Sequence, residues 1–239
     1  MPTFETLFGQ SENNIKKVCV LAPYMTKGLL KGFGIEKLYK GNPYSSANGF
    51  NFTFIHTQIS TSFLGDVVLR LKNTPCEHLI LFGSCGAVSK QKNIDFGSLV
   101  VPQCSYAFEG FSRLLEADVS NIKSFAANEQ LLKSFGKLDC ARGIPVVNCA
   151  TFGSFYLEEK YKEYLESKKI DIIEMECSAF FHAARNVKKK AFALFYVTDI
   201  LGEKNVFDEL SESDKKVLEL SIVKGQKIIH DFITSLNQL

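Results

Sequence analysis

The stretch His78-Leu-Ile-Leu-Phe82, followed by Gly83-Ser-Cys-Gly86, decides the fold of this 239-residue chain. The mostly apolar run predicts a buried central strand, and two glycines with a serine predict a tight turn directly after it. In open α/β sheets, ligands collect at the carboxyl ends of the strands. A glycine-rich turn at that position lets backbone N–H groups approach an anion or a sugar oxygen closely. The turn is not a dinucleotide-binding loop, because the pattern GxGxxG is absent.

Strand and helix patterns alternate on both sides of this stretch. Residues 61–72 carry apolar side chains at helical spacing, and residues 191–197 are apolar on both faces, which places that strand inside the sheet. Pro145 predicts that the strand 143–149 lies at an edge of the sheet or contains a bulge. The other predicted strands are 18–21, 50–55, 98–102 and 170–174; the other predicted helices are a charged surface helix 158–169, helix 176–187 and a terminal helix that begins at a capping box, 211–214. This alternation predicts an α/β layer fold, and without a repeat or a linker we expect one domain over residues 1–239.

Composition limits the classes of partner. The net charge of +2, from 28 basic and 26 acidic residues, offers no clustered basic face, so we expect no nucleic-acid partner. No apolar run approaches the ~18 residues that a membrane span needs. Seven cysteines without CxxC spacing indicate reduced thiols and a cytoplasmic protein, and four scattered histidines predict no metal site.

Two further strand ends carry polar residues that suit chemistry. Glu174-Met-Glu176 stands where a predicted strand meets a helix, so its carboxylates either cap that helix or accept hydrogen bonds from a vicinal diol such as that of ribose. Thr198-Asp199 follows a long apolar run. A buried acid there has a raised pKa, as a general acid near neutrality requires, although an N-cap for the next segment is the alternative.

Taken together, these motifs resemble a known family. Gly83-Ser-Cys-Gly-Ala-Val88, Phe155-Tyr156, Glu174-Met-Glu176 and Thr198-Asp199 occur in the order and approximate spacing of the bacterial-type nucleoside phosphorylases. The resemblance covers nearly the whole chain, and the combination is more specific than any one motif. It implies a three-layer fold with a central mixed sheet flanked by helices, a small-molecule nucleoside as substrate, and a homo-oligomer, either a dimer or a trimer of dimers.

The resemblance also implies roles for individual residues. Asp199, next to Thr198, would protonate N7 of a purine, and Glu176 would bind the ribose hydroxyls beside Glu174. Met175 would lie under the ribose. The base and sugar walls implied by the likeness are Phe155, which stacks on the base, Tyr156, Ser84 on the sugar or phosphate side, and Cys85 and Gly86 on the base side.

The residues with which the family binds or activates the nucleophile are not matched in this sequence. Leu81 occupies the position that matches a phosphate-binding arginine of the phosphorylases. Residues 22–27 correspond to the first glycine-rich loop of the phosphorylases and lack its arginine and glycine. Lys27 is the substitute cation in this segment, but a lysine cannot bind phosphate with the two-pronged geometry of arginine. The same segment, around Tyr24, also lacks the acid with which related nucleosidases activate water.

Three functions therefore stay open. The first is phosphorolysis of a purine nucleoside, with inorganic phosphate as co-substrate and no other cofactor, because the GSCGAV hexapeptide is most similar to the phosphorylases. The second is a hydrolytic nucleosidase acting on a nucleoside or thionucleoside, which Leu81 favours. The third is a nucleoside-binding protein that kept the pocket and lost turnover.

Overall fold

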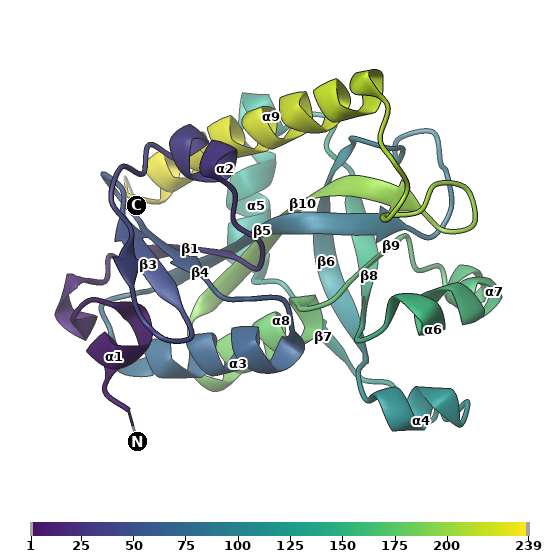
Figure 1. Cartoon of the computed structure of the whole chain (residues 1–239), viewed down its shortest axis with the longest axis horizontal. Coiled ribbons are helices and arrows are strands. Elements are labelled where there is room, and N and C mark those ends of the chain that lie inside the picture. The colour runs from purple at the N-terminus through teal and green to yellow at the C-terminus, as the bar shows by residue number, and fades with distance from the viewer. Residues whose placement is uncertain (1, 238–239) are drawn as a thin grey trace.

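One mixed sheet runs through the molecule in this computed structural model, which describes residues 2–237 (Figure 1). The strand order is β10-β6-β8-β9-β5-β1-β4-β3-β2, and β7 pairs with β6. The strands are β1 (Val18–Ala22), β2 (Tyr39–Lys40), β3 (Ser45–Asn48), β4 (Thr53–His56), β5 (His78–Ala87), β6 (Leu99–Phe108), β7 (Ser124–Ala126), β8 (Val146–Phe152), β9 (Ile172–Glu174) and β10 (Lys190–Ile200).

Helices cover both faces of the sheet, as an α/β layer fold requires. They are α1 (Phe4–Phe8), α2 (Lys27–Gly32), α3 (Thr61–Arg70), α4 (Phe111–Leu115), α5 (Glu129–Gly136), α6 (Phe155–Lys160), α7 (Lys162–Ser167), α8 (Cys177–Asn186) and α9 (Glu212–Leu236). Figure 1 shows α2, α5 and α9 on one side of the central strands and α1, α3 and α8 on the other. The predicted three-layer fold is confirmed, and α9 begins at the predicted capping box on Ser211.

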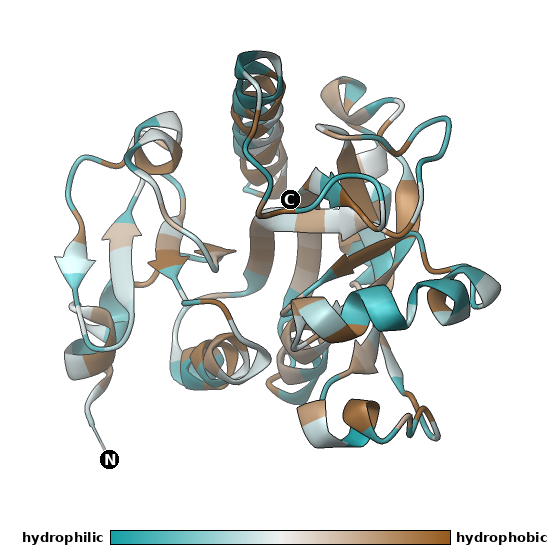
Figure 2. Ribbon diagram, turned by 45° about the vertical axis from the view of Figure 1, so that its right-hand side comes forward, coloured by the Kyte–Doolittle hydropathy of each residue, from teal (hydrophilic) through white to brown (hydrophobic). Residues whose placement is uncertain are grey.

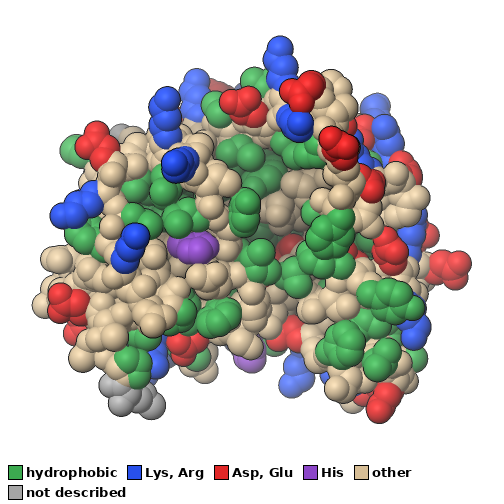
Figure 3. All heavy atoms as spheres, in the orientation of Figure 1, with side chains coloured by type: hydrophobic (Ala, Val, Ile, Leu, Met, Phe, Trp, Pro, Cys, Tyr) green, Lys and Arg blue, Asp and Glu red, His purple; other side chains and the backbone are tan. Residues whose placement is uncertain are grey.

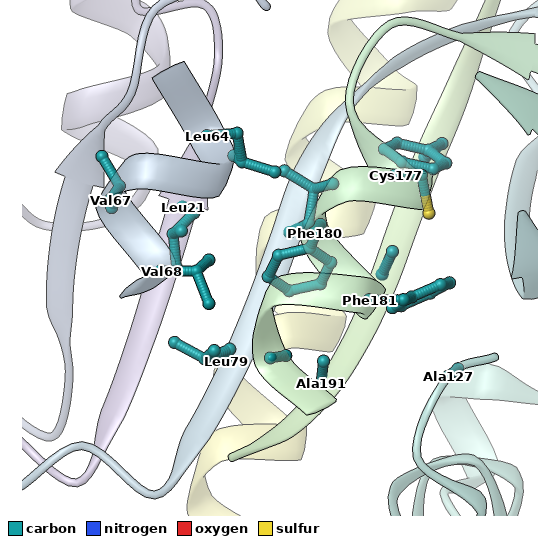
Figure 4. Packing of buried hydrophobic residues seen from close by; sticks show 14 of the residues in the cluster. Leu21, Leu64, Val67, Val68, Leu79, Ala127, Cys177, Phe180, Phe181 and Ala191 are labelled. Carbon is teal, nitrogen blue, oxygen red and sulfur yellow. The ribbon is translucent and has the colours of Figure 1, made fainter. Parts of the chain in front are cut away.

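Two large hydrophobic clusters hold these layers together. On one face, Leu64, Val67 and Val68 of α3 meet Phe180 of α8 above the buried side chains of the sheet (Figure 4). On the other face, α2, α5 and α9 cover strand residues such as Phe192. A third, smaller cluster lies under α6 and α7, and in Figure 2 the central strands are predominantly hydrophobic, whereas α6 and the loop before α9 are mostly hydrophilic.

The predicted tight turn at Gly83–Gly86 is wrong. These residues continue β5, because the parallel strand β10 pairs with β5 along its whole length and brings Asp199 opposite Gly86. The glycines sit inside the ladder. The glycines leave space above the sheet for neighbouring side chains, and the chain does not reverse direction there.

Two other expectations also need correction. Strand β8 begins just after Pro145 and lies between β6 and β9, so it is not at an edge; Pro145 stands outside the ladder and contributes only its carbonyl, to the N–H of Val101. The predicted surface helix 158–169 is two short helices that begin at Phe155, and Glu158 is buried. The cap of Ser154 on the backbone of Leu157 sets that earlier start.

The sheet closes on itself around the strands that matter for function. Besides following the strand order, β10 pairs with both β5 and β6, so β5, β10, β6, β8 and β9 form a closed ring. Strand β9 pairs with the last residues of β5, where Gly86 faces Ile173. Because of this closure, the ends of β5, β9 and β10 meet at one place.

Candidate active site

The ends of β5, β9 and β10 surround a cavity of about 200 Å³. A second cavity of about 230 Å³ adjoins it on the side of the loop 201–211. Hydrophobic side chains gather across the middle of the face shown in Figure 3. The sequence-predicted residues that line the first cavity are Ser84, Cys85, Gly86, Phe155, Glu174, Met175, Glu176, Thr198 and Asp199. These residues are far apart in the chain, so the fold gathers the three motifs into one site.

Asp199 is held at the cavity by a local irregularity of β10. The ladder with β5 shifts register between Val197 and Asp199, and a bulge of this kind re-aims the following side chain. The carboxyl group then lies above Gly86, where any Cβ would clash with its Oδ2 atom. The hydroxyl of Thr198 donates to Oδ1 at 2.7 Å. Asp199 is therefore fixed by the strand, so its N-cap alternative does not apply.

The pKa of Asp199 is shifted in the direction that a general acid needs. Its side chain is buried, with 8% of the residue exposed. Burial raises the pKa of this carboxyl group above its ordinary value, and the hydrogen bond from Thr198 partly offsets that rise. The group thus holds a proton at higher pH than a solvated aspartate does.

Glu174 acts on the protein itself. Its Oε2 atom accepts the backbone N–H groups of Glu176 at 2.6 Å and Cys177 at 2.7 Å, at the start of α8. Its Oε1 atom accepts the hydroxyl of Thr151 at 2.5 Å. Burial raises the pKa of Glu174 to about 7, and these three hydrogen bonds oppose the rise. The sequence left two roles open for Glu174, a helix cap and a ligand of a vicinal diol. Its contacts are those of a helix cap.

Glu176 is the opposite case, because part of its carboxyl group has no partner. Only 6% of the residue is exposed, and Oε1 is a buried atom for which residues 2–237 offer no hydrogen bond. Burial and the charge of Glu174 raise the pKa of Glu176 well above its ordinary value, and the backbone amide of Ser60 opposes this. An unsatisfied buried acceptor costs on the order of 1–3 kcal/mol, which a donor group of a ligand would relieve.

The sequence did not single out Glu158, which lines both cavities from the first turn of α6. Burial, followed by the charges of Asp199 and Glu159, raises the pKa of Glu158 to about 8. A segment that is charged over most of its length is typical of a solvated helix, and Glu158 is the exception within it. The available clue was its position three residues after Phe155, one turn along the same helix face.

The aromatic residues divide between the cavity and its rim. Phe155 lines both cavities and makes an edge contact with Phe207 of the loop 201–211, at 5.1 Å between ring centroids. Tyr156 is 77% exposed and lies outside both linings. Tyr24 and Ile59, which the sequence did not assign to the site, line the first cavity at its exposed rim.

No lysine, arginine or histidine is found among the described residues that line the first cavity. Leu81 is fully buried in the hydrophobic core. Lys27, at the start of α2, lines a separate surface depression. His56 is hydrogen-bonded to the backbone of Pro23, and burial lowers its pKa, which favours the neutral ring. The cavity wall therefore holds several carboxyl groups and no positive side chain from residues 2–237.

One group of side chains brings potential metal ligands together. The ligand atoms of Cys149, Glu174 and Cys177 lie within 4.8 Å of one another, the only such group in the described part of the chain. All three residues are buried, and burial raises the pKa of both thiols. A metal ion would have to displace the hydrogen bonds of Glu174 and deprotonate these thiols, so the donor set fits a capped helix better than a metal centre.

Comparison with known proteins identifies the fold family. The model of the phosphorylase superfamily matches residues 66–234, which include β5, β9, β10 and every carboxyl group described above. The chain belongs to the phosphorylase superfamily. A DeoD-type purine nucleoside phosphorylase from Brevibacillus brevis is 29% identical over 152 residues, or 61% of this chain. The chain spans 63% of the length of that superfamily relative.

Solved structures of a nucleosidase, a hydrolase and a phosphorylase share the fold over nearly the whole chain. The 5′-methylthioadenosine/S-adenosyl homocysteine nucleosidase of Campylobacter jejuni superposes with a TM-score of 0.71 at 16% identity, covering 95% of this chain and 100% of that one. The futalosine hydrolase of Helicobacter pylori gives 0.72 at 15%, covering 94% and 99%. The uridine phosphorylase of Vibrio fischeri gives 0.72 at 20%, covering 92% and 93%. At these identities the likeness establishes the fold alone, and the proteins that share this fold include both a phosphorylase and hydrolases.

Proposed function

We propose that this protein cleaves the N-glycosidic bond of a purine nucleoside. The observation that carries the proposal is that one cavity is lined both by Asp199 and by Glu176 with its unpartnered Oε1 atom. A carboxyl group with a raised pKa suits proton donation to N7 of a purine, and an unsatisfied carboxylate oxygen suits the hydroxyls of ribose. The DeoD-type relative acts, by its name, on purine nucleosides, which agrees with this choice of base.

The chemistry needs both groups at once. A purine anion is a poor leaving group, and protonation at N7 improves it. As the bond breaks, the ribose develops positive charge, as in other glycosyl cleavages. The unpartnered Oε1 atom of Glu176 brings the partial negative charge of a carboxyl oxygen to this buried site, where such an interaction is stronger than in water. Phe155 provides an apolar wall on which the base can stack.

We further propose that the nucleophile is water. The wall around Asp199 and Glu176 holds carboxyl groups and, within residues 2–237, no cation to balance the charge of a phosphate ion. Phosphorolysis, to free base and ribose 1-phosphate, is the second candidate, supported by the GSCGAV segment and the DeoD-type relative. A role limited to binding is less well supported, because Asp199 lines the cavity and no side chain of residues 2–237 fills it.

The deciding experiment is release of free base from inosine, adenosine and 5′-methylthioadenosine, each with and without phosphate. We expect cleavage of at least one of them, at a rate that does not depend on phosphate, with free ribose or its 5′-thio derivative as product. Phosphate-dependent cleavage that yields the sugar 1-phosphate would overturn hydrolysis. Binding without any cleavage would overturn catalysis.

The active form is proposed to be a homo-oligomer. Large apolar side chains are exposed at the rim of the cavity: Tyr24 is 61%, Tyr156 77% and Phe207 75% exposed. Large apolar side chains exposed near a cavity are typical of interaction sites. Light scattering coupled to gel filtration is expected to give a dimer or larger assembly, and a monomer at micromolar concentration would contradict the proposal.

A further inference from the structure

The second cavity, of about 230 Å³, adjoins the first cavity at the proposed base side. The two linings have in common four residues from this side: Phe155, Glu158, Asp199 and Val206. Met175 and Glu176, at the proposed ribose side, line only the first cavity. The second cavity therefore continues the first one beyond the base, away from the sugar.

The size of the two cavities agrees with a ligand that extends past the base. The first cavity measures about 200 Å³, whereas small-molecule sites usually begin at roughly 300 Å³, which the two cavities together exceed. In a purine, N7 and the group at C6 lie on the same edge. Because Asp199 is the proposed partner of N7 and lines both cavities, a substituent at C6 can enter the second cavity.

The lining of the second cavity is acidic. Its carboxyl groups come from α6, β10 and the loop 201–211: Glu158, Glu159, Asp199, Glu203 and Asp208. The lone cation of this lining, within the described residues, is Lys204, whose Nζ atom binds Asp214 at 2.7 Å and lies over the ring of Phe96. A group that enters the cavity thus meets several carboxyl groups and one cation that is already paired, so positive charge is favoured there.

Glu158 is buried, with 6% of the residue exposed, whereas Glu159, Glu203 and Asp208 around the same cavity are exposed. Glu159 accepts a hydrogen bond from Nδ2 of Asn205 at 3.3 Å, and Asp208 accepts one from the backbone of Asn205 at 2.8 Å. No hydrogen bond from residues 2–237 reaches the carboxyl group of Glu158, and its oxygens are not fully enclosed, so they open on the cavities that it lines. Such a buried acceptor is costly unless a ligand brings a donor to it.

We propose that the second cavity is a subsite for a positively charged substituent at C6 of the purine, and that Glu158 is the carboxylate that binds it. The subsite rests on the proposed function, because it needs a base in the first cavity. An ammonium group on the substituent donates hydrogen bonds to Glu158, and the exposed carboxyl groups of Glu203 and Asp208 add negative charge around it. The substrate class is then a purine nucleoside that carries an aminoalkyl group on its base.

The electrostatics of Glu158 agree with a cationic ligand. Burial, followed by the charges of Asp199 and Glu159, raises the pKa of Glu158 to about 8. This is the direction expected for a carboxyl group without a neighbouring cation, and an ammonium group in the second cavity favours the ionised form. Binding is therefore best measured at pH 8, where Glu158 is partly ionised and an alkylammonium group still carries its proton.

The first test compares two free bases by calorimetric titration, 6-(2-aminoethylamino)purine and 6-propylaminopurine. Their substituents have the same number of non-hydrogen atoms, and only the first is charged. We expect the wild type to bind the amine at least about tenfold more tightly, the factor typical of a charge-assisted hydrogen bond. Equal affinity, tighter binding of the propyl compound or binding of neither base would overturn the subsite.

Glu158→Gln removes the charge from the subsite and keeps the size of the side chain. In E158Q we expect the preference for the amine to fall to within about threefold, because the neutral amide no longer attracts an ammonium group. Glu163→Gln, on the exposed surface of α7 and outside both linings, should keep the wild-type preference. An unchanged preference in E158Q would show that Glu158 does not bind the charged group.

Cleavage of the corresponding nucleosides separates the subsite from the proposed function. We expect kcat/KM for the aminoethyl nucleoside to exceed that for the propyl nucleoside by about tenfold. Cleavage of adenosine and of both substituted nucleosides without this preference would support the proposed function and overturn the subsite. If no nucleoside is cleaved, the proposed function fails, and the affinities of the two free bases for the wild type and E158Q still decide whether the subsite exists.

Discussion

The two sides of the cavity differ in how they are built. The base-and-ribose side, formed by Glu158, Glu174, Glu176 and Asp199, consists of buried carboxyl groups with raised pKa values. The nucleophile side, to which Pro23, Tyr24 and Ile59 contribute, has neither an acid nor an arginine. The difference suggests that binding of the nucleoside and activation of the leaving base depend on fixed protein groups. The nucleophile, in contrast, needs only room to reach the ribose.

The largest effect on catalysis is expected for Asp199→Asn. The amide keeps the shape of the side chain but has no acidic proton to give to N7, so we expect kcat to fall by roughly 10²–10⁴-fold with little loss of nucleoside affinity. Steady-state cleavage and calorimetric binding measure the two effects. Turnover at the wild-type rate would show that the leaving base takes its proton from another group.

Glu176→Gln tests the ribose contact. Loss of one charged hydrogen bond to a sugar hydroxyl should lower kcat/KM by about tenfold to a hundredfold. The matched control is the substrate: the wild type should lose a similar factor on a 2′,3′-dideoxynucleoside, and the variant should lose little more. If the two losses multiply independently, Glu176 does not bind these hydroxyls.

Glu174→Gln separates a structural carboxyl group from a ligand-binding one on the same side of the cavity. An amide cannot accept all of the hydrogen bonds that Glu174 receives from Thr151 and the start of α8, so we expect a loss of about 1–3 kcal/mol in the free energy of unfolding. Glu163→Gln, on the exposed surface of α7, should change it by less than about 0.5 kcal/mol. Urea unfolding of both variants gives the answer. An unchanged midpoint for E174Q would contradict the capping role.

The sequence predicted which residues gather on the proposed base-and-ribose side, because its motifs follow strands that local patterns reveal. The apolar run before Thr198-Asp199 and the strand-to-helix junction at Glu174-Met-Glu176 are both visible over a few residues. The layer architecture follows from the same alternation of patterns. The resemblance to the nucleoside phosphorylases added the relative placement of these motifs, which local patterns alone do not contain.

Long-range pairing accounts for what the sequence missed. Gly83–Gly86 has the composition of a turn, and pairing with the partner strands β10 and β9 makes it a strand. Glu158 belongs to a segment with the composition of a solvated helix, yet it is buried where that helix meets the two cavities. Glu158 and Asp199, which both line the two cavities, are likewise 41 positions apart, so no local window contains them together.

The smallest expected effect concerns the nucleophile side. Addition of phosphate at millimolar concentration should change the rate of cleavage by less than about twofold, because a cavity lined by carboxyl groups repels an anion. Lys27→Ala should be as active as the wild type, since Lys27 lines a different depression from the cavity. Rates measured against phosphate concentration for both proteins provide the test. A phosphate requirement that disappears in the K27A variant would make Lys27 the missing cation, and would show that the first loop moves toward the cavity when the anion binds.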